Sequence, residues 1–105
     1  MDNKSAQFQI GQIITHRLFD YRGVIIDVDP VFSHSEEWYE TMAKSRPPKD
    51  APWYHVLVHD SMQQTYVAER NLKAGETGEQ IRHPAIPHYF DGFENGLYIL
   101  KQTVN

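Results

Sequence analysis

The side chains of this 105-residue chain that are best suited to chemistry begin with two aspartates, Asp27 and Asp29, directly before Pro30. Residues two apart in a strand project from the same face, so the two carboxylates could share a cation. The neighbouring sequence supplies no further oxygen ligands at the spacing of a calcium or magnesium loop. We therefore interpret the pair as the solvated face of a strand that ends in an Asp-Pro turn, and we predict no metal there.

The six histidines raise the same question of metal binding. His55 and His59 are four residues apart, a spacing that on a helix would place both on one ion. Here they belong to an apparent strand, in which four residues span about 13 Å, too far for one ion. The other histidines have no partner motif: His16, His34, His83 and His88. The sequence therefore predicts no metal site.

Motifs for nucleophilic catalysis and phosphate binding are missing from the sequence. It contains no Gly-x-Ser-x-Gly elbow and no glycine-rich phosphate loop. The absence of cysteine excludes disulfides, thiolate zinc sites and a cysteine nucleophile. Glu36, Glu37 and Glu40 lie around Trp38, but a helix dipole favours acidic residues at a helix start without any catalytic role. We predict that the chain is not an enzyme and uses no catalytic residue or cofactor.

Charge argues against a dedicated nucleic-acid binder. Ten Lys and Arg stand against 14 Asp and Glu, a formal net charge of −4, whereas DNA affinity rests on cations that neutralise phosphates. The basic residues are also scattered, and only Lys44, Arg46 and Lys49 form a local group. The polar start of the chain lacks the apolar core of a signal peptide, and no apolar run approaches the roughly 20 residues that span a bilayer. We expect a cytoplasmic protein with no membrane contact.

The elements that must position these side chains are short strands. Apolar and β-branched runs predict strands at 12–16, 23–29, 53–59, 65–68, 79–82 and 97–101. Alternation within the second strand predicts that Val24, Ile26 and Val28 share one face. The segment 17–22 connects the first two strands. About five short strands at this spacing indicate a mainly β protein, a small barrel formed by a single domain.

One helix is expected between the second and third strands. Ser33 followed by Glu36 matches a capping box, so the helix would run from about His34 to Lys44. Prolines at 47 and 48 end it, and a further helical turn is expected at 85–90. Trp53 and Tyr54 are adjacent in a strand and must face opposite ways, so at least one of them is expected at a surface.

The ordered motifs resemble one family. They lie in the segments FQIGQIITHRLFDYRGVIIDVDPVFSHSEEWY, PPKDAPWYHVLVHDSMQQTYVAERNL and IRHP, between about Phe8 and His83. These segments look like the YccV-like, hemimethylated-DNA-binding domain, also called the heat-shock protein HspQ family. The resemblance implies an SH3-type β-barrel of about five strands with one inserted short helix. It would form one domain over 1–105 with a core at about 7–101.

The resemblance also implies two functions. The first is a cytoplasmic heat-shock or stress protein that modulates degradation of denatured proteins, including the replication initiator, by an ATP-dependent protease such as Lon. The second is a DNA-binding module that recognises hemimethylated DNA. Family members are expected to form homo-oligomers, with a trimer as the candidate assembly. We rank the protease adaptor first, because the net charge disfavours DNA unless assembly gathers the cations on one face.

A candidate contact surface follows from both readings. DNA binding needs phosphate anchors and an apolar contact to the methyl group. The available anchors are Arg17, Arg22, Arg46 and Lys49, and the candidate methyl contacts are Tyr21 and Trp53. The segments 18–22 and 52–55, the second with His55, carry the most recognisable polar and aromatic residues. Gly23 and Pro30 are expected to be structural, whereas Arg22 and His55 stay open between the two roles.

Overall fold

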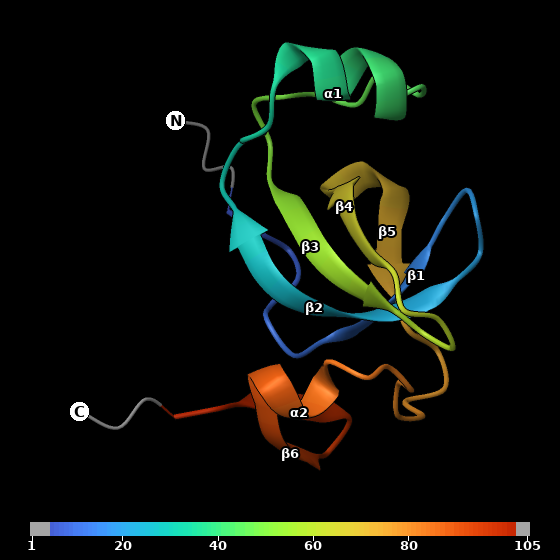
Figure 1. Cartoon of the computed structure of the whole chain (residues 1–105), viewed down its shortest axis with the longest axis vertical. Coiled ribbons are helices and arrows are strands. Elements are labelled where there is room, and N and C mark those ends of the chain that lie inside the picture. Colours follow the sequence, from blue (N-terminus) through green and yellow to red (C-terminus); the bar gives the residue numbers. More distant parts are fainter. Residues whose placement is uncertain (1–4, 103–105) are drawn as a thin grey trace.

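The computed structural model describes residues 5–102, which form two antiparallel sheets and two short helices (Figure 1). The strands are β1 Ile13–His16, β2 Arg22–Asp29, β3 Trp53–Val58, β4 Gln64–Ala68, β5 Leu72–Ala74, β6 Phe90–Glu94 and β7 Leu97–Leu100. The helices are α1 Glu36–Met42 and α2 Ile86–Tyr89, and a 3₁₀ turn, η1 Glu69–Asn71, joins β4 to β5. Within these residues no helix is long and apolar enough to cross a membrane.

The larger sheet has the strand order β4-β3-β2-β1-β5, and β6 and β7 form a separate hairpin. Helix α1 and this hairpin lie at opposite ends of the larger sheet (Figure 1). The chain is mainly β, as predicted. Within residues 5–102, however, the sheets do not close into a barrel, because β4 and β5 are edge strands that pair on one side only.

Strand β2 carries a bulge that overturns the predicted alternation. Ile25 pairs with Val56, and Asp27 pairs with His55, the residue before Val56. Ile26 is therefore left without a cross-strand partner on β3. An extra residue reverses the facing of everything after it. Val28 consequently packs with Ile25 in one apolar cluster, whereas Val24 and Ile26 belong to another. The prediction that Val28 shares their face was wrong.

Helix α1 begins later and ends earlier than predicted. Its N-cap is Ser35, whose hydroxyl accepts a hydrogen bond from the backbone N–H of Trp38 at 3.0 Å. The Ser33 hydroxyl instead donates to the carbonyl of Val31. The helix ends at Met42, so Lys44 lies beyond its last turn.

Three strand assignments also differ. The 79–82 segment is not a strand, because its backbone bonds to a side chain and a loop: the N–H of Ile81 donates to the Tyr98 hydroxyl, and the carbonyl of Arg82 accepts from Asp60. Strands β5 and β6 were not predicted. Each is short, and β5 is defined by its pairing with β1 rather than by local alternation.

Both members of the aromatic pair on β3 are buried. Trp53 is 1% exposed and Tyr54 is 0% exposed, so the expectation that one of them lies at a surface was wrong. Each face of β3 is covered: Tyr39 from α1 packs over Trp53, and Phe8 packs edge-on against Tyr54 with ring centroids 5.7 Å apart. A strand covered on both faces buries both sets of side chains.

Candidate functional site

A groove of about 850 Å³ lies between α1 and the loop at residues 17–21, with β4 between them. In Figure 1, α1 lies above β4, and this loop lies further to the right, beyond β5. The described residues that line the groove are His16, Leu18, Phe19, Tyr21, His34, Trp38, Met42, Ala43, Lys44, Ser45, Pro47, Trp53, His55, Gln63, Gln64, Thr65, Tyr66, Val67, Ala68 and Asn71. A cavity of this size, lined largely by apolar and aromatic groups, is typical of a binding site.

The helix wall of the groove follows from the spacing of residues on α1. Trp38 and Met42 are four apart and line the groove, whereas Tyr39 lies in the core; Ala43, four residues after Tyr39, is buried in the same cluster and also borders the groove. Residues four apart share a helix face. Trp38 lies edge-on to Tyr66 of β4 with ring centroids 5.5 Å apart, and Tyr66 stacks on buried Trp53 at 5.1 Å. Met42 remains 61% exposed at the rim.

The loop wall is held by a buried histidine. Nδ1 of His16 accepts hydrogen bonds from the backbone N–H groups of Leu18 and Phe19, both at 3.1 Å. The His16 ring stacks on Phe19 with centroids 4.7 Å apart. Burial lowers the pKa of His16 and so favours the neutral ring that these bonds require. The loop presents two apolar side chains to solvent, with Leu18 57% and Phe19 74% exposed.

Strand β4 forms the bottom of the groove along its edge. All six residues from Gln63 to Ala68 line the groove, although alternate side chains of a strand point to opposite faces. The Thr65 hydroxyl is 2.7 Å from that of Tyr21 in the loop wall, whereas Tyr66 packs toward the helix wall. The groove therefore runs along the strand and has one wall on each face of the sheet.

The groove differs from the rest of the molecule in charge. Among the described residues that line it are Lys44 and three histidines, and none is Asp or Glu. The chain as a whole has a net charge of −4. The groove thus favours neutral or acidic occupants over basic ones.

Three of the seven predicted contact residues meet in the groove: Tyr21, Trp53 and His55. Tyr21 is half-buried and bonded to Thr65 through its hydroxyl, and burial is the main cause that raises its pKa. Trp53, at 1% exposure, lies beneath Tyr66 and is too deeply buried to meet a methyl group on DNA. His55 is partly exposed at the groove margin.

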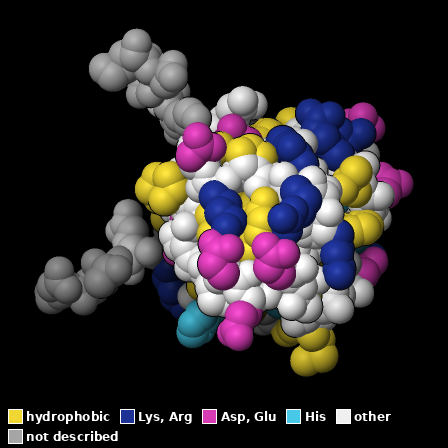
Figure 2. All heavy atoms as spheres, turned by 90° about the horizontal axis from the view of Figure 1, so that it is seen from above, with side chains coloured by type: hydrophobic (Ala, Val, Ile, Leu, Met, Phe, Trp, Pro, Cys, Tyr) yellow, Lys and Arg dark blue, Asp and Glu magenta, His cyan; other side chains and the backbone are white. Residues whose placement is uncertain are grey.

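The four predicted phosphate anchors do not line the groove. Arg46 forms an ion pair with Glu40 at 2.8 Å, and Lys49 forms one with Glu36 of the same helix. Figure 2 shows this face with basic side chains next to acidic ones and apolar atoms between them. The charges of Arg46 and Lys49 are therefore already matched by α1.

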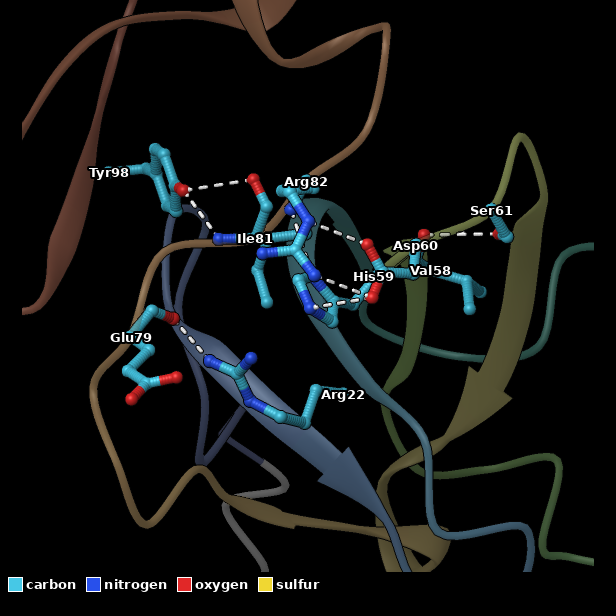
Figure 3. A network of polar contacts seen from close by, with 9 residues as sticks. All are labelled: Arg22, Val58, His59, Asp60, Ser61, Glu79, Ile81, Arg82 and Tyr98. Atoms are coloured by element: carbon cyan, nitrogen blue, oxygen red, sulfur yellow. Dashed lines mark hydrogen bonds and ion pairs between the residues drawn. The ribbon is translucent and has the colours of Figure 1, made fainter.

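The other two anchors bond to backbone carbonyls. Nε of Arg17 donates to the carbonyl of Leu72 at 3.0 Å, and the Arg22 guanidinium donates to the carbonyl of Glu79. Figure 3 shows Arg22 directed at this 79–82 segment. A carbonyl holds a guanidinium in place without neutralising its charge.

Asp27 and Asp29 have a third neighbour that sequence reasoning missed. His55 pairs with Asp27 across the β2–β3 ladder, and one ligand atom from each of the three residues lies within 4.8 Å of the others. Nε2 of His55 is 3.2 Å from Oδ2 of Asp29, which also accepts a hydrogen bond from Tyr66 at 2.7 Å. Carboxylate and imidazole donors suit several divalent ions. The absence of a metal stays a prediction.

Sequence reasoning singled out the loop at 18–22 but missed the helix wall and β4. Two signals were present: Leu18 and Phe19 are adjacent apolar residues in a polar loop, and Trp38 and Met42 share a helix spacing. Neither signal shows which residues remain uncovered in the folded chain.

A comparison with known protein families gives a match over residues 6–97 to the YccV-like family, described as hemimethylated DNA-binding protein YccV like. The match includes every residue named in the groove walls and in β4. The chain belongs to the YccV-like family.

Proposed function

We propose that this chain is a non-enzymatic stress protein whose groove binds apolar segments of denatured proteins and thereby modulates their degradation by a Lon-type ATP-dependent protease. The observation that carries the proposal is the groove itself, with its aromatic walls and its exposed Leu18, Phe19 and Met42. Exposed apolar side chains around a concavity are typical of a surface that contacts protein. The replication initiator is one client that the family resemblance implies.

The finer fold and the setting belong to the same proposal. The strand order β4-β3-β2-β1-β5, with a 3₁₀ turn between β4 and β5, is consistent with an SH3-type barrel that remains open between these two strands. The cytoplasm as its location and a homo-oligomer, such as a trimer, as its assembly follow from the family resemblance.

The experiment follows degradation of reduced, carboxymethylated lactalbumin by a purified Lon-type protease, with and without this chain. We expect the degradation rate to change several-fold with the natural chain and to change much less with the Phe19→Ser variant. Met62→Ser is the matched control, because Met62 is 84% exposed and does not line the groove. A rate that the natural chain leaves unchanged would overturn the proposal.

Binding to hemimethylated DNA is the second candidate, and the family description favours it. Among the hydrogen bonds of residues 5–102, three guanidinium groups bond to carbonyls rather than carboxylates, those of Arg17, Arg22 and Arg70. Arg17 and Arg70 also line one smaller cleft of about 270 Å³, which Glu69 lines as well. These two arginines are better placed to meet phosphates than Arg46 and Lys49.

This candidate is tested by fluorescence anisotropy with hemimethylated and unmodified duplexes over a range of salt concentrations. A phosphate-anchored complex must weaken steeply as salt rises, with a log–log slope of about −0.9 per phosphate neutralised. The variant Arg17→Gln should flatten the slope, and the control Arg46→Gln should not. Failure to bind either duplex at low salt would remove this candidate.

A further inference from the structure

The backbone of β4 has one side directed toward β3 and one side directed into the groove. The N–H of Val58 donates to the carbonyl of Gln63, and the N–H of Glu69 donates to the carbonyl of Pro52. Bonded pairs in an antiparallel ladder recur every second residue, so between Gln63 and Glu69 the odd-numbered residues bond to β3. The N–H and C=O groups of Gln64, Tyr66 and Ala68 therefore point away from β3.

This outward side is not taken up within the described part of the chain. Strand β4 pairs with β3 alone, and no hydrogen bond from outside the β3–β4 pair reaches the backbone of Gln64, Tyr66 or Ala68. The groove runs along this side of the strand. An open strand edge is a template for pairing with another chain, which proteins commonly block.

The two edge strands of the larger sheet, β4 and β5, differ in how much open backbone they offer for pairing. Strand β5 has three residues, whereas β4 has five and its edge lies in a groove. The loop at 17–21 and α1 stand on either side of β4. These walls hinder the flat approach of another sheet, and the groove between them has a volume of about 850 Å³.

We propose that the occupant of the groove is an extended peptide segment that adds to the edge of β4 as a further strand; this inference rests on the proposed function. Its backbone would bond to Gln64, Tyr66 and Ala68. Main-chain bonds supply affinity in such complexes without regard to sequence, and pockets for alternate side chains supply selectivity. This mode suits a module that must accept many unrelated denatured clients.

The walls set the kind of segment that fits. Alternate side chains of an added strand point to opposite faces, so one set meets the helix wall at Trp38 and Met42. The other set meets the loop wall at Phe19 and Tyr21. Lys44 and the absence of Asp and Glu among the described lining residues favour a segment with acidic rather than basic flanks.

The first experiment is an N-methyl scan of a peptide. The probe is a fluorescent octapeptide, two Asp followed by three Val-Ser repeats, titrated with the natural chain. N-methylation removes one backbone donor without changing the side chain. We expect methylation of alternate amides to weaken binding at least tenfold and methylation of the intervening amides to weaken it less than threefold.

The second experiment removes a donor from the protein. Gln64→Pro deletes an N–H that points away from β3, a position where a strand tolerates proline, and should weaken binding at least tenfold. Gln64→Ala keeps the N–H and loses only the side chain, so as the matched comparison it should weaken binding less than threefold. Circular dichroism of both variants checks the fold, and the N-methyl scan keeps the inference testable if Gln64→Pro does not fold.

The outcomes separate the two proposals. If the unmodified peptide binds and every methylated analogue binds equally well, strand addition is overturned while the groove function stands. If the unmodified peptide does not bind and client degradation is unaffected, both fall. If sedimentation shows that Gln64→Pro abolishes self-association and the peptide does not compete with it, the occupant of the edge is a second copy of this chain and the inference is wrong.

Discussion

Tyr66 of β4 donates a hydrogen bond from its hydroxyl to Oδ2 of Asp29 on β2, at 2.7 Å across the intervening strand β3. The same Tyr66 hydroxyl accepts a bond from the backbone N–H of Ser33, just before α1. One side chain thus connects β2, β4 and the segment that leads into the helix wall. This contact gives the two aspartates different roles, although they look equivalent in the sequence.

We predict that Asp29→Ala destabilises the protein by about 1–3 kcal/mol, because it leaves the Tyr66 hydroxyl and His55 without their acceptor. The matched variant Asp27→Ala should change stability by less than about 0.5 kcal/mol. Asp27 is exposed, and its carboxylate accepts only the N–H of Val28 among the described hydrogen bonds. Urea unfolding of the three proteins measures the difference. Equal losses for the two variants would contradict the distinct role of Asp29.

Alkaline pH should weaken the fold through Tyr66. Burial, with the hydrogen bond to Asp29 as a further cause, raises the pKa of Tyr66 from 10.0 to about 12. Between these values the folded state holds a proton that the unfolded state has lost. The corresponding stability is complete below pH 10 and is lost as pH rises toward 12.

The variant Tyr66→Phe cannot ionise at this position, so its unfolding free energy should fall less over the same pH range. The other buried tyrosines titrate in both proteins and cancel in the comparison. Urea unfolding between pH 8 and pH 11 measures the two slopes. Identical slopes would refute the assignment to Tyr66.

Acid should weaken the fold through His16. Burial lowers the pKa of His16 below 6.5, so below that pH the unfolded state binds a proton that the folded state excludes. The stability from neutral His16 is present above pH 6.5 and is lost as pH falls. His16→Asn keeps an acceptor near the N–H groups of Leu18 and Phe19 but does not titrate. Its unfolding free energy should decline less than that of the natural chain between pH 7 and pH 5, and a parallel decline would exclude His16.

Phe19→Ser should leave stability within about 0.5 kcal/mol, because a largely exposed side chain adds little to folding. The same change should weaken binding of the octapeptide described above by about tenfold. Phe19 would be covered by the bound peptide, and truncating an aromatic side chain that is buried in a complex typically lowers the binding free energy by a few kcal/mol. Isothermal titration measures the binding, and Met62→Ser should have no effect on it. Unchanged binding by Phe19→Ser would remove the loop wall from the site.

Gly23→Ala should cost about 1–3 kcal/mol, the usual penalty of overpacking a core. A Cβ at Gly23 would lie 2.6 Å from the carbonyl oxygen of Leu57 and 2.5 Å from Cγ1 of Val56. Gly92→Ala is the control, since its Cβ would meet nothing closer than 3.8 Å and the position does not need a positive φ. Thermal unfolding compares the two, and a neutral Gly23→Ala would show that β3 can move away.

Local pattern predicted much of the secondary structure. The alternation of apolar residues located β2, β3 and β4, and the capping pattern located the helix region, although α1 ends at Met42, before the prolines that were expected to stop it. The predicted alternation of faces failed after Ile26, because whether a strand contains a bulge depends on the partner strand. Local pattern failed for β5 as well, whose three residues form a strand only beside β1.

The sequence by itself determined a mainly β chain, its family and one short helix, because these depend on periodicity and on ordered local motifs. The tertiary structure alone decided that Trp53 is buried, that Asp29 has acquired Tyr66 and His55 as partners, and that the edge of β4 faces a groove. Each of these depends on which segments distant in the chain become neighbours. The residue type and its neighbours in the sequence limit what a side chain can contact. Its burial and its partners depend on which distant segments the fold places beside it.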